Sequence, residues 1–542
     1  MSEDAHRFRD KTHILTGDPQ ILASDKHTPQ YSTMSASSPK QPVTLYNVFV
    51  VACATLASIL LGYASGVIGG TLGQASWYRV MGLQMVPGKP GYSHTETIQG
   101  ASNGTFYAFA TIGTILIGEI MGLLGRIRAF QIASALHIVG AAIQTGSVNQ
   151  AMFLVGRGIT GLAAGSTIVI GPVYFSEVAP PSSRGSMAGM HGAGINTGYM
   201  LAAWVGFGSS YANPTTTFGF RFPLAIPILI ALIILGATLW MPESPRHLVD
   251  KGRSSEALAI LTSLHGHGNH EFAQRELREI ELQVAEEKAA FKEKSAFMIL
   301  FTQMTYLKRV ALGILVCSGV INTGVLVINN YAVIIYSSLG LSTTVSLLLS
   351  AVWLTLAAFW NWLGAFLSDR VGRRRILLIG NIGTTAMLII FTGLYAKFQE
   401  TGDRKYATAC LVFNFAFELF FGAGVDPHVY TVAAEIFPVH LRAKGESIAL
   451  AGYYIYSIIW TEAAPPAFSS IGWKFYLVFI CIQFLQITLI YLYLPETANV
   501  PLEEIDEVFG GQVKVHLNDA DLIMDPTSEE VEVKEAKAAI KE

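Results

Sequence analysis

Charged residues are scarce in this chain of 542 residues, at 14% of the sequence, whereas soluble domains carry about 25%. The formal net charge of −3 provides no strong positive field, which argues against nucleic acid as a partner. The four cysteines all fall within apolar stretches, so no disulfide framework is expected. The chain also lacks a nucleophile–base pair, a glycine-rich phosphate loop and metal-ligand spacing. We therefore expect no enzyme, no cofactor and no metal.

Apolar residues are abundant, at 51%, and they gather in stretches long enough to cross a bilayer as helices of about 20 residues. The pattern predicts an all-α membrane protein with twelve transmembrane helices. Six lie at about 45–69, 103–124, 129–147, 151–174, 186–207 and 222–241, and six at about 308–329, 342–366, 374–396, 406–433, 446–466 and 472–494.

Polar segments divide the chain further. Residues 1–44 lack the apolar core of a signal peptide and are predicted to be a disordered cytosolic tail, and 495–542 a second one. Between the six-helix halves, 45–241 and 307–494, the linker 242–306 is expected to form amphipathic helices. Because Lys and Arg concentrate in this linker, we expect the linker and both termini to be cytosolic.

One charged layout occurs twice. Glu177 is followed seven residues later by Arg184, and Glu435 by Arg442 at the same step. Each half also has a Gly-Arg pair upstream, Gly125-Arg126 and Gly372-Arg373, and a Pro-Glu pair near its end, with Glu243 and Glu496. Matched halves suit a transporter that opens a substrate site to one side and then to the other.

These motifs resemble those of the sugar porter family of the major facilitator superfamily, in a divergent, fungal-type member. The resemblance covers about 45–510 and depends on several motifs in order. They are Gly62-Tyr63 to Gly70, Gly156-Arg157-Gly158, Pro172 to Pro181 with Arg184-Gly185, Pro242-Glu243-Ser244-Pro245-Arg246, Asp369 to Arg374, Glu435-Ile436-Phe437-Pro438 with Arg442, and Pro495-Glu496-Thr497. The family implies two pseudo-symmetric halves, the major facilitator fold.

The resemblance also implies a gate of charged residues at the cytosolic helix ends. We expect pairs between the halves that hold the inner face shut, each worth about 0–1 kcal/mol if partly exposed. Gly122 replaces the acid that the family usually has three residues before the first Gly-Arg, and Glu119 is a candidate substitute. The gate residues implied are Arg126, Glu177, Arg184, Glu243, Asp369, Arg373, Glu435, Arg442 and Glu496.

The binding layer departs from the family. The family's span-5 Gln corresponds to Gly192, its span-7 Gln pair to Val320-Ile321, and its span-10 Trp to Tyr430. Other polar residues at this depth are candidates, since ionisable groups within a bilayer are usually functional. The predicted substrate-binding residues are His191, Asn196, Asn322, Asn329, Asn330, Asp426, His428, Tyr430 and Tyr453.

Asp426-Pro427-His428 is the strongest of these signals. Counting back from Glu435 places Asp426 about 13 Å inside the membrane, where Pro427 is expected to break the helix. Glu418 and Glu462 are expected nearer the outer face, as charges that snorkel to water.

Coupling to protons stays open. Proton-coupled family members carry an acid in span 1 where this chain has Ala64, although the partner arginine is retained as Arg157. This favours a facilitator. The competing hypothesis makes Asp426 the proton-binding group, so the coupling candidates are Arg157 and Asp426.

Three functions are weighed. The first is transport of a sugar or sugar-like small polar solute, the second is transport of a non-sugar, aromatic or acidic metabolite, and the third is a nutrient sensor that does not transport. In each case the expected partners are a small-molecule solute and the lipid bilayer, with protons as a further candidate. A monomer in the plasma membrane is expected. Asn103 in Asn-Gly-Thr matches the glycosylation pattern, so the chain is a candidate glycoprotein.

Overall fold

The computed structural model describes residues 45–86, 88–178, 184–213, 215–266, 270–290, 296–438 and 441–496. The predicted N-terminal tail and the chain beyond residue 496 lie outside the described residues. The described part consists of helices and short loops and contains no strand.

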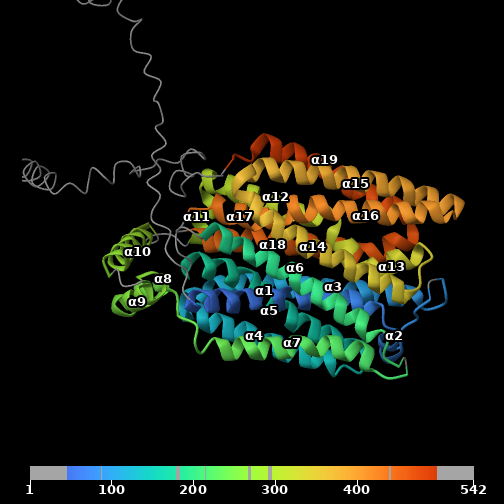
Figure 1. Cartoon of the computed structure of the whole chain (residues 1–542), viewed down its shortest axis with the longest axis horizontal. Helices are drawn as coiled ribbons and strands as arrows, with labels where there is room; N and C mark the ends of the chain where they lie inside the picture. The colour runs from blue at the N-terminus through green and yellow to red at the C-terminus, as the bar shows by residue number, and fades with distance from the viewer. Residues whose placement is uncertain are drawn as a thin grey trace, which may run out of the picture. The chain divides into compact units, whose positions relative to one another are not determined.

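The long helices form two sets of six spans, coloured blue to green and yellow to red in Figure 1. The first set is α1 (Leu45–Leu72), α3 (Tyr92–Leu124), α4 (Arg126–Thr145), α5 (Gln150–Val178), α6 (Arg184–Ser209) and α7 (Phe218–Ala237). The second is α12 (Met304–Asn322) with α13 (Val325–Ser338), α14 (Thr343–Val371), α15 (Arg373–Thr401), α16 (Arg404–Gly424) with α17 (Asp426–Ile436), α18 (Arg442–Ser470) and α19 (Phe475–Tyr493).

Shorter helices connect the spans. They are α2 (Ala75–Met81), α8 (Pro245–Asp250), α9 (Ser254–Leu261), the π-helical turn η2 (Thr262–Gly266), α10 (His270–Ala290), α11 (Ala296–Thr302) and the 3₁₀ turn η3 (Gly472–Lys474). α8, α9 and α10 pack on one another around Leu248, Val249, Ala257 and Val284. We call the end of the bundle that carries them the linker end.

The span count agrees with the twelve expected. Among the described residues, ten segments are long and apolar enough to cross a membrane. α6 and α18, of 26 and 29 residues, add the remaining two. They are less apolar because they pack across onto the opposite half, α6 against α14 and α18 against α3, so that part of each faces protein instead of lipid.

Two spans of the second half are broken. α12 ends at Asn322 and α13 begins at Val325, with Gly324 at φ 84° between them. α16 ends at Gly424 and α17 begins at Asp426, which confirms the predicted break at Pro427. The break at Gly324 was not predicted, because a single glycine in an apolar run does not by itself indicate an interruption.

The second span begins at Tyr92, eleven residues before the predicted start at 103. Asn103 therefore lies within α3, is fully buried, and donates from Nδ2 to the Tyr331 hydroxyl at 3.2 Å. A glycan has no room there, so the glycosylation prediction is corrected.

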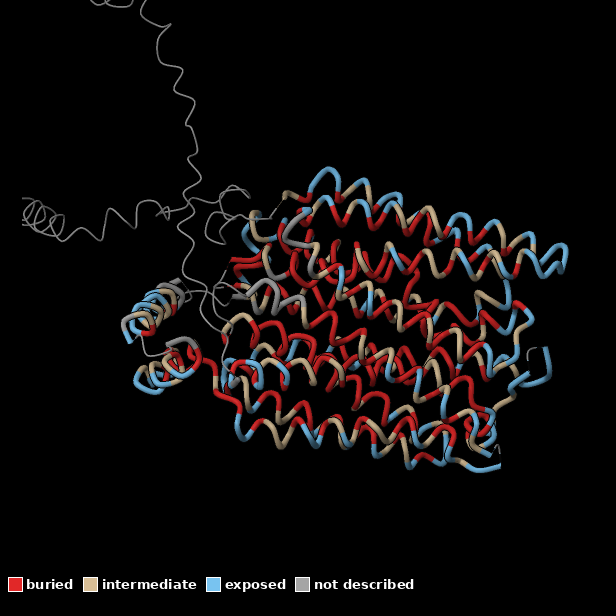
Figure 2. Tube along the Cα trace, in the orientation of Figure 1, coloured by how far each residue is buried: buried red, intermediate tan, exposed pale blue. Residues whose placement is uncertain are grey.

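Close helix packing depends on small residues, as in many membrane bundles. A Cβ at Gly161 or Gly165 of α5 would overlap the carbonyl oxygen of Phe106 or Ala110 on α3. Figure 2 shows the buried residues running through the middle of the bundle, with exposed residues along its outside. Many exposed residues of the long helices, such as Leu229 and Ile233, are apolar, as expected for contact with lipid.

Candidate functional site

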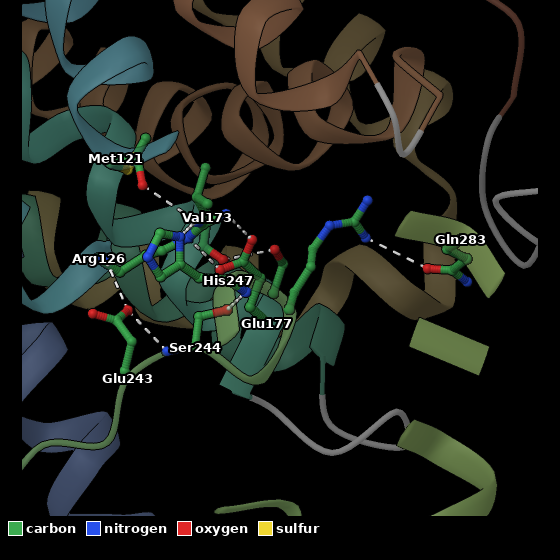
Figure 3. Close-up of polar contacts among 10 residues, drawn as sticks. Met121, Arg126, Val173, Glu177, Glu243, Ser244, His247 and Gln283 are labelled. Carbon is green, nitrogen blue, oxygen red and sulfur yellow. Dashed lines mark hydrogen bonds and ion pairs between the residues drawn. The ribbon is translucent and has the colours of Figure 1, made fainter. Parts of the chain in front are cut away.

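At the linker end, Arg126 joins three elements of the first half (Figure 3). Its guanidinium pairs with both oxygens of Glu177 on α5, at 2.6 and 2.7 Å. The Glu243 carboxylate accepts from the backbone N–H groups of Arg126 and Ile127 at 2.8 and 3.2 Å. Glu243 thus caps the N-terminus of α4, where a helix favours negative charge.

The second half repeats this arrangement. Arg373 Nη2 lies 3.4 Å from Glu435 Oε1. The Glu496 carboxylate accepts from the backbone N–H groups of Arg373 and Arg374 at 2.7 and 3.4 Å. The doubled motif in the sequence therefore corresponds to a doubled cap and ion pair in space.

A glycine is required at both turns. Gly125 and Gly372 have φ of 94° and 97°. A Cβ on either would lie 2.4 Å from Glu243 Oε2 or 2.7 Å from Glu496 Oε2. Gly-Arg is thus the sequence signal of a turn that brings a carboxylate against the start of the next helix.

These ion pairs lie within each half, so the expectation that they join the halves is wrong for Arg126–Glu177 and Arg373–Glu435. A charged contact that does cross between the halves is Lys444 Nζ on α18 with Glu119 Oε1 on α3, at 2.8 Å. Glu119 had been identified as the substitute for the acid missing at Gly122, and the structure gives it this partner.

The remaining gate residues are less fully described. Arg442 begins α18, one turn before the buried Glu446. The side chains of Arg184 and Asp369 lie outside the described residues.

His247 was missed by the sequence analysis. It lies in α8 after the capping residue Ser244, and its Nδ1 is 3.2 Å from Arg126 Nη1. Burial, and then the neighbouring Arg126, lower the pKa of His247. A neutral imidazole accepts at Nδ1, so His247 is a further partner of Arg126. The signal was its position directly after the Pro-Glu-Ser-Pro-Arg motif.

A central cavity lies between the halves. Asp426, at the start of α17, is its most connected polar group. Asp426 Oδ2 accepts from Asn196 Nδ2 on α6 at 2.6 Å and from Asn361 Nδ2 on α14 at 2.7 Å. The Asn196–Asp426 hydrogen bond therefore joins the two halves at the cavity wall.

Five of the nine predicted binding residues line this cavity: Asn196, Asn329, Asp426, Tyr430 and Tyr453. His191 lies behind the wall, with Nδ1 2.8 Å from Ser58 Oγ and its ring edge-on to Tyr430 at 5.6 Å. The other three are not among the lining residues. Asn322 accepts from Trp460, Asn330 donates to the Tyr107 hydroxyl, and His428 is fully buried with neither ring nitrogen bonded to a described residue.

The cavity also contains residues that the sequence analysis missed or misplaced. Tyr199 and Trp353 line it. Asn361 is not a lining residue but donates a hydrogen bond to Asp426. Glu418 lines it too and is 1% exposed, which corrects the expectation of a snorkelling charge near the outer face. Its sequence signal was the same as that of Asp426, an acid inside an apolar span, but depth alone does not reveal which side of a helix faces the centre.

Among the described residues, the hydrogen-bond acceptors of the fourth-span arginine are main-chain carbonyls and not acids. Arg157 is fully buried and donates to the main-chain oxygens of Ser102 at 3.0 Å and Ala64 at 3.2 Å. Its guanidinium also stacks over the Phe106 ring at 4.2 Å. The charge is thus held by carbonyls and an aromatic face.

A second cavity lies at the end of the bundle opposite the linker, between α3 and the helices α13, α15, α18 and α19. Its walls are rich in tyrosine, with Tyr92, Tyr331, Tyr395 and Tyr476. Tyr331 spans the halves, because it accepts from Asn103 and donates to Thr461 O at 2.8 Å.

Twelve spans in two matched halves, a charged layer at one end and a polar cavity between the halves define a multi-pass membrane transporter of the major facilitator type. Residues 50–509 match the family described as "Sugar (and other) transporter". The chain belongs to this family, and it is a transmembrane transporter of a sugar or other small solute, not an enzyme.

Known relatives transport different solutes. The chain is 30% identical to the MFS-type transporter criB of Aspergillus cristatus over 86% of this chain and 95% of the relative. It is 28% identical to the low-affinity glucose transporter HXT3 of Saccharomyces cerevisiae (86% and 82%) and 27% to the quinate permease of Neurospora terricola (86% and 90%). The structure of the proton:xylose symporter XylE bound to 6-bromo-6-deoxy-D-glucose matches with a TM-score of 0.72 at 22% identity, over 86% of this chain and 99% of XylE. This structural likeness shows the fold.

Proposed function

We propose that the chain moves a sugar or a sugar-like small polar solute by alternating access, as a facilitator. The observation that carries the proposal is the Asn196–Asp426 hydrogen bond, which joins the halves at the wall of the central cavity. A solute that competes for these groups would loosen one of the contacts that hold the halves in their present relative position. Binding would thereby bias the equilibrium between states open to either side.

The charged layers support the same mechanism. Because Arg126 and Arg373 are bound within their own halves, each layer holds a half together as a rigid unit. The contacts broken in transport are then those between the halves, among them Glu119–Lys444. Partly exposed ion pairs contribute about 0–1 kcal/mol, weak enough to break in each cycle.

A second candidate cargo is a non-sugar metabolite. Gly192 stands where the family has a hydrogen-bonding Gln. A Cβ built on Gly192 would lie 3.5 Å from both Asn361 Oδ1 and the Tyr430 ring. Three tyrosines, Tyr199, Tyr430 and Tyr453, line the cavity beside the amides of Asn196 and Asn329. The name of the quinate permease shows that relatives handle cargo other than simple sugars.

Facilitated diffusion is favoured over proton symport because Ala64 offers only a carbonyl to Arg157. The competing hypothesis places the proton on Asp426. Proteoliposomes decide between them: substrate-driven internal acidification that is abolished by Asp426→Asn supports symport, whereas uptake without proton movement excludes it.

We further propose that the linker end and both termini are cytosolic, that the chain is a monomer, and that it resides in the plasma membrane. The Lys and Arg residues of 242–306 support this orientation. Cysteine labelling from each side of intact cells tests it.

The decisive experiment for the function is uptake of a radiolabelled panel of sugars, polyols and ring metabolites in cells that lack their own transporters. Saturable uptake of one panel member supports the proposal. Binding of a solute without any uptake favours the nutrient sensor.

A further inference from the structure

Glu418 lines the central cavity and is unused by the mechanism above. It lies on α16, is 1% exposed, and its Oε2 has no hydrogen-bond partner among the described residues. A buried polar atom without a partner is rare in proteins and calls for an explanation. Here the atom belongs to the wall of a cavity that a solute is expected to enter.

The described residues of the cavity wall include acidic side chains but no basic ones. Among the described residues that line the cavity, Glu418 and Asp426 are acidic and none is Lys, Arg or His. Asp426 Oδ2 accepts from two amide N–H groups. That arrangement suits a carboxylate oxygen, which accepts but does not donate.

The rest of the wall is aromatic. Tyr199, Tyr430, Tyr453, Trp353 and Phe421 contribute ring surface on several sides. Such rings offer a large apolar contact area to a flat or ring-shaped solute, and the tyrosine hydroxyls add hydrogen bonds at its edge. The cavity therefore combines apolar faces with an excess of acceptors.

We propose that Glu418 and Asp426 make this cavity selective for neutral, ring-shaped solutes rich in O–H or N–H donors and exclude carboxylate-bearing solutes, with Glu418 bonding the solute directly. This inference rests on the proposed function and narrows its cargo. Within the two candidate cargo classes, polyols and neutral aromatic solutes remain candidates, and acidic solutes are excluded. A carboxylate entering the site would have to leave water without meeting a cation among the described lining residues, and that transfer is costly.

The test measures binding, so that it does not depend on transport. The full chain in lipid nanodiscs is titrated with three matched pairs, D-glucose and D-glucuronate, myo-inositol and quinate, and 4-hydroxybenzyl alcohol and 4-hydroxybenzoate. Tryptophan fluorescence reports binding, and Trp353→Phe identifies the contribution of the cavity. We expect at least one neutral member to bind at least about tenfold more tightly than its acid. Tighter or equal binding of an acid, or no binding by any neutral member, overturns the proposal.

Glu418→Gln separates specificity from structure, because it keeps the shape of the side chain and replaces its acid group with an amide that can donate a hydrogen bond to a carboxylate. The variant is expected to bring the neutral-to-acid affinity ratio toward one. Glu462→Gln, which alters an exposed acid on α18 outside the cavity lining, is expected to leave the ratio unchanged. If Glu418→Gln weakens both members equally, Glu418 is structural and the inference fails.

Uptake by proteoliposomes of the same protein is measured separately. Selective binding without uptake would refute the proposed function and leave this inference standing. Uptake of neutral and acidic members at equal rates would support the proposed function and refute this inference.

Discussion

The two halves share one charged layer but contribute unequally to the cavity. Each half has a Gly-Arg turn, a carboxylate cap and an Arg–Glu pair. Yet twelve of the fifteen residues that line the cavity come from the second half. The spans broken at Gly324 and Val425 are also in this half, whereas the corresponding α1 and α5 run unbroken. The charged layer is therefore alike in the two halves, whereas the cavity is built mainly by the second half.

The largest difference between the halves is expected at Asp426. Asp426→Ala removes the side-chain acceptor of the buried amides of Asn196 and Asn361, at about 1–3 kcal/mol for a donor left unpaired. Uptake of the best panel solute should fall at least about tenfold at equal membrane abundance. Ile168 stands nine residues before Glu177, as Asp426 does before Glu435. Ile168→Val is the matched control and should retain uptake, and an equal loss in the two variants would contradict the asymmetry.

The two turn glycines test the symmetry of the charged layer. Gly125→Ala and Gly372→Ala each place a Cβ against a capping carboxylate at a backbone conformation suited to glycine, with an expected loss of about 1–3 kcal/mol. Both should lower the melting temperature by similar amounts. Gly122→Ala, where a Cβ meets no atom within 4 Å, should not. A loss confined to one turn would show that the two layers are not equivalent.

The ion pair between the halves predicts a smaller effect. Glu119→Lys and Lys444→Glu should each shift uptake rates by the equivalent of about 0–1 kcal/mol, because each places like charges together. The double exchange should restore the wild-type rate. Without such restoration, the pair does not bear on transport.

The smallest effect is expected at His247. Because the folded chain lowers its pKa, the unfolded chain takes up the proton more readily as the pH falls below about 6.5, and stability falls with it. The melting temperature of the wild type should therefore drop more between pH 7 and pH 5.5 than that of His247→Gln. Identical drops would exclude a role for this histidine.

Much of the architecture was predictable because the relevant signals are local. The twelve spans follow from apolar length, and the two turns are marked by the Gly-Arg pairs upstream of Glu177 and Glu435. The site was predictable only in part, because lining a cavity depends on which side of a helix faces the centre. Asp426 carried its own signal in the adjacent Pro427. Glu418 and Asn361 have no such neighbouring proline, and their importance arises from α14 and α16 meeting α17.

Which charged residues pair with one another was the least predictable feature. The charges of the gate were identified, but Arg126 and Arg373 bind within their halves because the capped turns bring Glu177 and Glu435 alongside. Lys444 was not identified, because a lysine at a helix end is common and its partner Glu119 is distant in sequence.

The contacts between the halves change in character along the bundle. Two contacts away from the linker end join uncharged groups, Asn103 with Tyr331 and Asn330 with Tyr107, whereas Lys444 and Glu119 at the linker end are charged and partly exposed. Dissolved salt screens exposed charges over about 8 Å at physiological ionic strength and leaves buried amide–hydroxyl bonds unaffected. The ionic strength of the compartment at the linker end should therefore tune how readily the halves separate. At the opposite end, the described residues form no ion pair between the halves on which the ionic strength of the other compartment could act.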